Sequence, residues 1–163
     1  MPREPVLQAS TSKKVQVRRF DRETVAGFVN PQTWQQPDGL EVLSQQGAVL
    51  LIPYDQVKAA IFVRDFTEEP SGSPVFNTRP KMHGVWVRLR FRDGEIMEGL
   101  ISNNLLMLEP NGFTVTPPNP TPNRQRVFVP RAALEEVSVL GVVGSPLKKP
   151  AKPKAREQIG LFE

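Results

Sequence analysis

The sequence predicts an all-β protein built from two tandem five-stranded small barrels, and three observations lead to this prediction. One stretch of the chain repeats: VQVRRFDRETVAGFVN at residues 15–30 aligns with VRLRFRDGEIMEGLIS at residues 87–102, at an offset of 72. In the second copy apolar residues alternate with polar ones at period two, as in a half-buried strand. Turn-forming residues separate short apolar runs, which is typical of compact β folds.

Each copy is expected to contain five short strands, the first two joined in a hairpin. Asp93-Gly94 predicts a type I′ turn in the second copy, whereas the first copy has the less favourable Asp-Arg-Glu at residues 21–23. Gly27 and Gly99 lie inside the second strands, where glycine indicates a sharp bend or a close backbone approach. Such a bend lets one strand serve two sheets, as in a small closed barrel.

The remaining strands follow in the same order in both copies. LEVLSQ and GFTVTP are expected as third strands, the apolar runs before Pro53 and Pro130 as fourth strands, and AAIFV and VSVLGVV as fifth strands after one helical turn. Residues 117–125, PPNPTPNRQ, form a loop inserted into the second copy. The predicted boundaries are a flexible N-terminus at 1–14, barrel one at 15–66, a linker at 67–84, barrel two at 85–144 and a disordered basic, proline-rich tail at 145–163.

Two stretches carry a resemblance to a known fold. RFRDGEIMEGLI at residues 90–101, followed by RVFVPRAALEEVSVL at residues 126–140, resembles Sm-like and SH3-like small β-barrels in its Asp-Gly hairpin, its glycine-bent strand and its turn before the last strand. The span 15–141 as a whole is similar to an uncharacterised bacterial domain family with this duplicated layout. The resemblance implies the fold, and it supplies no activity.

Composition limits the classes of function. The chain has a formal charge of +4, with +2 in residues 1–14 and +3 in residues 145–163, so that residues 15–144 carry −1. A nearly neutral body does not form a general phosphate-binding surface. The sequence has no cysteine and no run of about 20 apolar residues, which we expect of a cytoplasmic protein without a membrane span.

The residues needed for catalysis or metal binding are sparse. His83 is the one histidine, and it lies in the expected linker. The acidic pairs Glu68-Glu69 and Glu135-Glu136 are adjacent in sequence, and neighbouring carboxylates point apart on a loop or a turn. No glycine-rich phosphate loop is present. We therefore expect a protein that is not an enzyme, with no catalytic, cofactor or metal site.

The Sm-like resemblance implies RNA binding, which remains an alternative function. Asn103, Asn104 and Arg131 match its loop positions weakly, and Trp34 and Trp86 are candidates for stacking on bases. The net charge of the body argues against RNA or DNA as the partner of the barrels.

Three arginines form a second candidate contact for nucleic acid or for an acidic partner. Arg88, Arg90 and Arg92 alternate along one expected strand, so their side chains share one face. Arg18 is the counterpart of Arg90 in the first copy. The alternative interpretation is a solvated outer face whose charges discourage pairing of strand edges.

The end of the chain carries the most specific motif. Gln158-Ile159-Gly160-Leu161-Phe162 resembles the short peptide by which bacterial polymerases and repair proteins bind the DNA sliding clamp. The resemblance implies polar contacts by Gln158, a groove contact by Ile159, and insertion of Leu161 and Phe162 into a pocket. An alternative is that these apolar residues dock on a barrel of the same chain.

The basic residues before this motif would lie near DNA threaded through the clamp; they are Lys148, Lys149, Lys152, Lys154 and Arg156. The sequence thus predicts a non-enzymatic interaction or adaptor protein, recruited to the clamp through its C-terminal peptide. The alternatives are an Sm-like RNA-binding protein and a structural or signalling scaffold that binds a protein partner.

Overall fold

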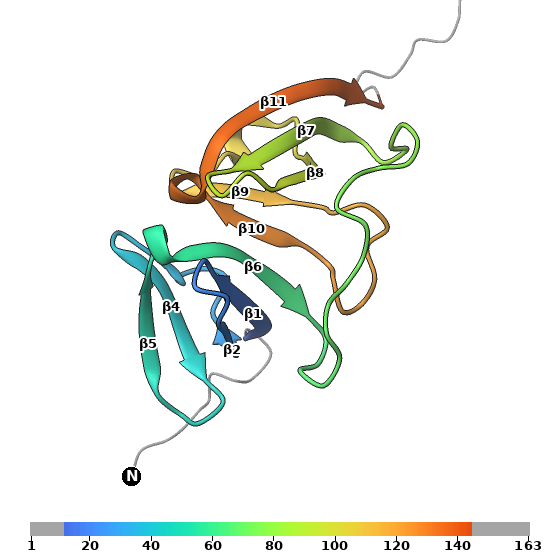
Figure 1. Cartoon of the computed structure of the whole chain (residues 1–163). Helices are drawn as coiled ribbons and strands as arrows, with labels where there is room; N and C mark the ends of the chain where they lie inside the picture. Colours follow the sequence, from blue (N-terminus) through green and yellow to red (C-terminus); the bar gives the residue numbers. More distant parts are fainter. Residues whose placement is uncertain (1–11, 145–163) are drawn as a thin grey trace, which may run out of the picture.

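The computed structural model describes residues 12–144, and the predictions for residues 1–11 and 145–163 lie outside this part of the chain. The regular structure of the described residues is β-strand with short 3-10 turns, which confirms the predicted all-β class (Figure 1). Copy one contains β1 (Lys13–Arg19), β2 (Thr24–Val29), β3 (Gln35–Gln36), β4 (Gly39–Ser44), β5 (Val49–Pro53), the 3-10 turn η2 (Tyr54–Gln56) and β6 (Val57–Val63). Copy two contains β7 (Gly84–Phe91), β8 (Ile96–Ile101), η3 (Leu105–Met107), β9 (Gly112–Val115), β10 (Val127–Pro130), η4 (Arg131–Ala133) and β11 (Leu134–Val143).

The two copies share one strand order. In copy one the antiparallel order is β5-β4-β2-β1-β6, with the short β3 added to β4. In copy two β11, β7 and β8 form one sheet, a bridge from Leu100 to Thr116 leads to the β9 segment, and β9 pairs with β10. The register repeats as well, because Val17 pairs with Ala60 just as Leu89 pairs with Val137. The internal repeat is therefore a repeat of structure.

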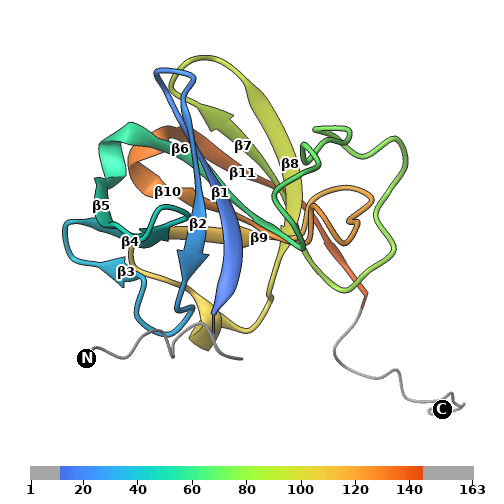
Figure 2. The ribbon, with the colours of Figure 1, turned by 90° about the horizontal axis from the view of Figure 1, so that it is seen from below.

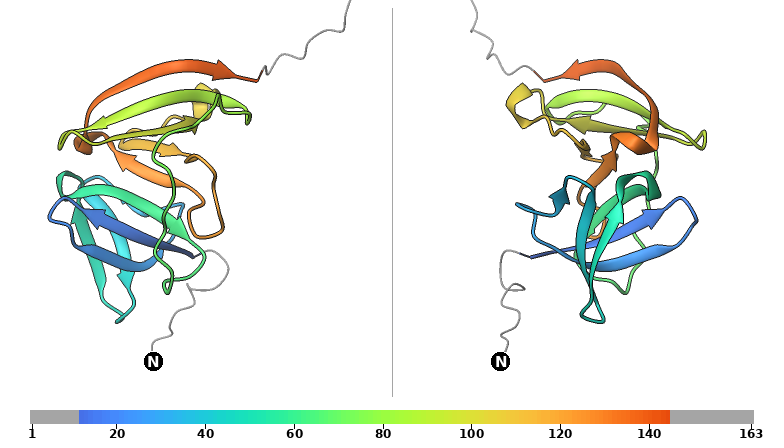
Figure 3. Two further views of the ribbon diagram at one scale, coloured as in Figure 1. Left: turned by 45° about the vertical axis from the view of Figure 1, so that its right-hand side comes forward. Right: turned by 90° about the vertical axis from the view of Figure 1, so that its left-hand side faces the viewer.

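A direct strand pairing joins the copies. β6, the last strand of copy one, pairs antiparallel with β10 of copy two, with Ala60 opposite Phe128 and Ile61 opposite Val127. Beyond these pairs, the Phe62 amide donates to the Arg126 carbonyl at 2.9 Å. The two copies consequently share a continuous sheet, and they lie as two lobes one above the other (Figure 3).

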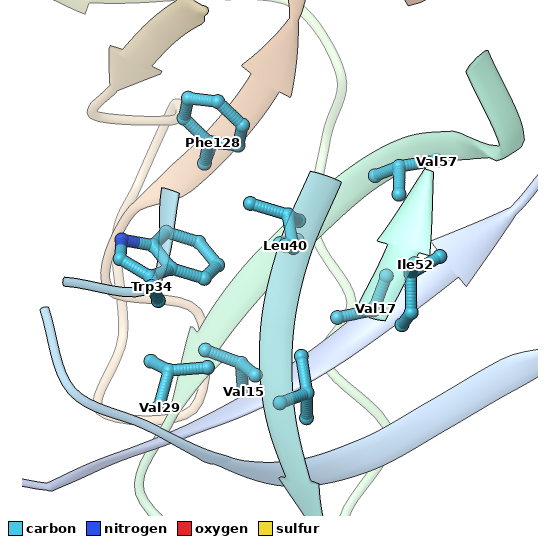
Figure 4. Close-up of a cluster of buried hydrophobic side chains, with 10 residues drawn as sticks. Val15, Val17, Val29, Trp34, Leu40, Ile52, Val57 and Phe128 are labelled. Atoms are coloured by element: carbon cyan, nitrogen blue, oxygen red, sulfur yellow. The ribbon is translucent and has the colours of Figure 1, made fainter. Parts of the chain in front are cut away.

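Strand β6 also supplies both hydrophobic cores. Ala60 belongs to the core of copy one, whereas Ala59, Ile61 and Val63 belong to the core of copy two. From Ala59 to Val63 this division follows from the alternation of side chains between the two faces of a strand, whereas Val57, beyond a register shift, lies in the core of copy one. A side chain of copy two also enters the core of copy one: Phe128 lies on β10 and packs in that core (Figure 4).

The β7–β8 hairpin differs from the predicted turn type. A type I′ turn needs positive φ at both central residues, but in the second hairpin Gly94 has φ 93° and Asp93 is not among the positive-φ residues. The type I′ prediction is thus wrong. The Phe91 amide instead donates to Glu95 and the Gly94 amide to Phe91, which closes a three-residue loop.

The glycines inside the second strands lie where the predicted close approach occurs. A Cβ at Gly27 would lie 2.3 Å from the Leu43 carbonyl oxygen, and one at Gly99 would lie 2.9 Å from the Val115 Cβ. Because these distances are shorter than real Cβ contacts, only glycine allows the third strand to approach here. This confirms the interpretation of both glycines.

The connection between the copies and the inserted loop are held together. They lie side by side in Figure 2. The buried Asn123 accepts from the amides of Arg64 and Asp65, each at 2.9 Å, and donates to the Glu68 carbonyl. Arg124, also buried, donates to Ser73 and Pro118 carbonyls. Strand β1 begins at Lys13, two residues before the predicted start of barrel one, and β7 begins at Gly84, one residue before the predicted start of barrel two.

Candidate functional site

A cleft of about 600 Å³ opens between the two copies. Copy one contributes Trp34 and Gln35 near β3 and Phe62 from β6 to its lining. Copy two contributes the end of β8, the loop from residue 102 to 111, and β9. The cleft therefore exists because β6 and β10 pair, and neither copy forms it alone.

Aromatic rings line part of this cleft. Trp34 and Phe62 meet edge to face, with ring centroids 5.4 Å apart. Trp34 also packs edge to face on Phe128 at 5.4 Å, and it is only 3% exposed (Figure 4). The guanidinium of Arg131 lies over the Phe113 ring, 4.8 Å from its centroid. These rings give the cleft a rigid apolar part.

Several hydrogen bonds connect the loop that borders the cleft to its surroundings. The Asn104 side chain caps η3 by accepting from the Leu106 amide at 3.1 Å. Arg131 donates to the Pro110 carbonyl at 3.0 Å and to the Glu109 carbonyl at 3.3 Å. The Glu109 carboxylate accepts from Thr114 at 2.8 Å and, across the cleft, from Gln35 at 3.3 Å.

This ordered loop presents four consecutive apolar side chains to solvent. Leu105 is 76% exposed, Leu106 91%, Met107 63% and Leu108 49%. Met107 and Leu108 also line the cleft, so the apolar surface continues from the loop into the hollow. We call residues 105–108 the apolar ridge. These residues lie in the loop after the second strand, where Asn103 and Asn104 are expected, but no pattern in the sequence indicates that the apolar run is exposed.

The polar groups of the cleft are suited to binding and orientation. Thr114 donates a hydrogen bond to the carboxylate of Glu109. Among the other polar residues that line the cleft are His83, Ser102, Asn103 and Arg126. Within residues 12–144 no group of three His, Cys, Asp or Glu side chains is placed to hold a metal ion. The arrangement can enclose an apolar side chain and bond the polar backbone beside it.

The predicted arginine stripe lies on β7 and at its end, with two of its members engaged within the fold. Arg90 makes ion pairs with Glu135 at 3.3 Å and Glu136 at 3.0 Å. Arg92 donates to the carbonyls of Ala132 and Asp55, at 2.8 and 2.6 Å. Arg88 is exposed on the same strand. The contact of this stripe with nucleic acid or an acidic partner stays a prediction.

The residues considered for RNA have other surroundings in the structure. Trp34 is buried in a core, so the prediction that it stacks on bases is wrong. Trp86 is half-buried, donates to Glu98 at 3.2 Å and packs edge to face on Phe76 of the linker. Asn104 and Arg131 shape the loop beside the cleft, as described above. Asn103 alone of the loop asparagines lines the cleft.

The clamp-like peptide lies outside the described residues. This holds for Gln158, Ile159, Leu161 and Phe162, and for the basic residues Lys148, Lys149, Lys152, Lys154 and Arg156. Their binding to a clamp or to DNA stays a prediction.

Comparison with known proteins identifies the family. A small all-β protein with a duplicated strand pattern is the class that the fold defines. Residues 11–141 match the family of unknown function DUF6982, and the chain belongs to this family. No curated protein and no solved structure matches the chain. Among residues 12–144 there is no helix with the length and apolar character of a membrane span.

Proposed function

We propose that the protein is a non-enzymatic adaptor whose folded body binds an apolar segment of a partner protein. The segment would lie along the apolar ridge and insert a side chain into the cleft between the copies. The observation that supports this proposal is the ridge itself, four consecutive apolar residues that are 49 to 91% exposed beside a hollow of about 600 Å³.

Two physical arguments favour a protein ligand. A cluster of exposed apolar side chains marks an interaction site, because removing this apolar surface from water on binding is favourable. The ridge is also held by the Asn104 cap and by Arg131, so little conformational entropy is lost when a partner binds. A rigid apolar ridge beside a hollow suits a partner with one or two large apolar side chains.

The second half of the proposal concerns recruitment. The terminal Gln158-Ile159-Gly160-Leu161-Phe162 would bind a bacterial sliding clamp, and the body would carry its own partner to the same place. This half rests on the sequence motif and on the basic residues before it. The two contacts are separate, so each can be tested with the other intact.

The body contact is tested by selecting displayed random peptides on the full-length protein. We expect enrichment of peptides with leucine or aromatic anchors, and loss of their binding in Leu106→Asp. Ile96→Asp is the matched control, because Ile96 is exposed on β8 and does not line the cleft. Peptides that bind both variants equally would contradict the proposal. Self-docking of the tail would appear as enrichment only after deletion of residues 145–163.

The recruitment contact is tested by fluorescence anisotropy of the labelled protein titrated with a bacterial sliding clamp. We expect saturable binding that Gln158→Ala combined with Phe162→Ala abolishes and that Leu106→Asp leaves unchanged. No binding up to tens of micromolar clamp, roughly the range of a weak linear motif, would contradict clamp recruitment while leaving the body contact standing.

A further inference from the structure

The repeat leaves two strand edges without the partner that its own symmetry provides elsewhere. At the junction, the fifth strand of copy one (β6) pairs with the fourth strand of copy two (β10). The equivalent strands are β11, the fifth of copy two, and β5, the fourth of copy one. Within residues 12–144, β11 pairs with β7 alone and β5 with β4 alone. Each therefore presents an open row of backbone groups.

The burial of equivalent side chains shows what the junction covers. Phe128, two residues before Pro130, is fully buried at the junction. Leu51, two residues before Pro53, has the equivalent position on the open edge and is 52% exposed. Its neighbour Val49 is 66% exposed. The open edge of β5 thus carries apolar side chains like those of β10, but no neighbouring strand covers them within residues 12–144.

The edge of β11 has the matching character. Val139 aligns with Phe62, because Phe62 pairs with Val15 in copy one and Val139 with the equivalent Val87 in copy two. Phe62 is half-buried beside the junction, whereas Val139 is 65% exposed. The backbone amide of Phe62 points away from β1 and donates to the Arg126 carbonyl beside β10. Because Val139 has the equivalent position on β11, its backbone amide points away from β7 toward the open edge.

We propose that β11 of one molecule pairs antiparallel with β5 of a second copy of this chain, in the register by which β6 pairs with β10. Leu51 would then lie opposite Val137, as Phe128 lies opposite Ala60, and Val139 would donate to Val49 as Phe62 donates to Arg126. A second copy is the expected occupant because this chain already contains the same contact, built from the same two repeat strands.

The geometry sets the form and the extent of the assembly. β5 and β11 lie at opposite ends of the molecule (Figure 1), so the contact is head to tail and adds molecules into a chain or a ring. The pairing segment of β11 is short, because the register shifts after Val139 and Arg79 donates to the Val142 carbonyl beyond it. Association is therefore expected to depend on protein concentration.

The test is sedimentation velocity of the full-length protein from roughly 10 µM to roughly 1 mM, the range of weak contacts. We expect species larger than a dimer that grow with concentration. Leu51→Lys places a charge on the β5 edge, and Val139→Lys places one on the β11 edge. Each variant should therefore lose one of the two pairing edges and remain monomeric. Mixed together, they should form a dimer and nothing larger, because each retains the edge that the other lacks. Ile96→Lys is the matched control and should assemble like the unchanged protein.

Three outcomes would overturn the proposal. The unchanged protein could be monomeric throughout the concentration range. Val139→Lys could assemble normally, which would indicate pairing of β5 with β5, or Leu51→Lys could do so, which would indicate pairing of β11 with β11. The replaced side chains are exposed, so the variants should fold, and unchanged far-UV circular dichroism and thermal unfolding would establish that loss of assembly is not loss of structure.

Discussion

Arg22 and Gly94 occupy the same position in the two equivalent hairpins, and both have positive φ, 76° and 93°. The hydrogen bonds agree as well, because the Arg22 amide donates to Arg19 and the Gly94 amide donates to Phe91. An L-residue with a side chain is disfavoured in this left-handed region, whereas glycine is not. Copy one therefore holds a strained backbone where copy two does not.

We accordingly expect Arg22→Gly to raise the free energy of unfolding by about 1 kcal/mol and Gly94→Ala to lower it by about the same amount. Chemical denaturation measures both. Arg22→Ala is the control, since it removes the charge but keeps the side-chain strain, and it should give little of the gain. If alanine stabilised as much as glycine, loss of the arginine charge and not relief of strain would be the cause.

The strand pattern of each copy could be predicted because its signals are local. Period-two alternation, the glycines at 27 and 99 and the prolines at 53 and 130 each act within one or two strands. The junction could not be predicted, because any open edge can pair with any other. Trp34 is the clearest case: its polar neighbours suggest an exposed loop, yet it is buried against Phe128 of the other copy.

The candidate site depends on the same long-range pairing. Its cleft lies between the copies, and its ridge is an apolar run in a loop whose exposure no pattern in the sequence indicates. The ridge lies on η3, which is capped by Asn104, and the end of its loop is bonded to Arg131, which lies 21 residues beyond Pro110 in the sequence. The local signals in the sequence that indicate a loop here are the capping Asn104 and the turn-forming Pro110-Asn111-Gly112.

Lys58 of copy one connects to the second hairpin through ion pairs with Asp93 and Glu95. Burial lowers the pKa of Lys58, but hydrogen bonds to both carboxylates outweigh it and the net shift is upward. The hydrogen bond from Lys58, with one from the Glu95 amide, lowers the pKa of Asp93. Asp93 therefore contributes stability that is present above its ordinary pKa and is lost as the pH falls through the lowered value.

Asp93→Asn should consequently cost less than about 1 kcal/mol at pH 7, because the pair is partly exposed. Its stability should converge with that of the unchanged protein as the pH falls below about 3.9, the ordinary pKa of aspartate. Urea unfolding at several pH values measures this convergence. Combining Asp93→Asn with Lys58→Met should cost less than the two single changes added together, and strict additivity would contradict the coupling.

Arg92 also crosses the junction. Its guanidinium donates to the Asp55 carbonyl at 2.6 Å in copy one and to the Ala132 carbonyl at 2.8 Å in copy two, and lies 3.8 Å from the centroid of Phe20. A lysine has one compact charge and cannot make the forked contact or the stacking. Arg92→Lys should thus lower the free energy of unfolding by about 1 to 2 kcal/mol.

The matched control for Arg92→Lys is Arg88→Lys. Arg88 lies on the adjoining strand β7 and is exposed, so its change should stay within about 0.5 kcal/mol. Both are measured by guanidinium denaturation. Equal effects of the two changes would mean that the Arg92 contacts contribute nothing to the junction.

The shared cores predict that the two copies unfold together. Phe128 of copy two is fully buried in the core of copy one, and β6 supplies residues to both cores. Phe128→Ala should therefore lower stability by about 3 to 5 kcal/mol in both copies. The two tryptophans report separately, since Trp34 lies in the core of copy one and Trp86 on β7 of copy two.

In Trp86→Phe the fluorescence comes from Trp34, and in Trp34→Phe it comes from Trp86. Within each of these backgrounds, adding Phe128→Ala should shift the denaturation midpoint to lower denaturant. The Trp86 signal is decisive, because Phe128 packs in the other core. A shift seen by Trp34 with none seen by Trp86 would mean that the copies unfold independently and that the β6–β10 pairing does not couple them.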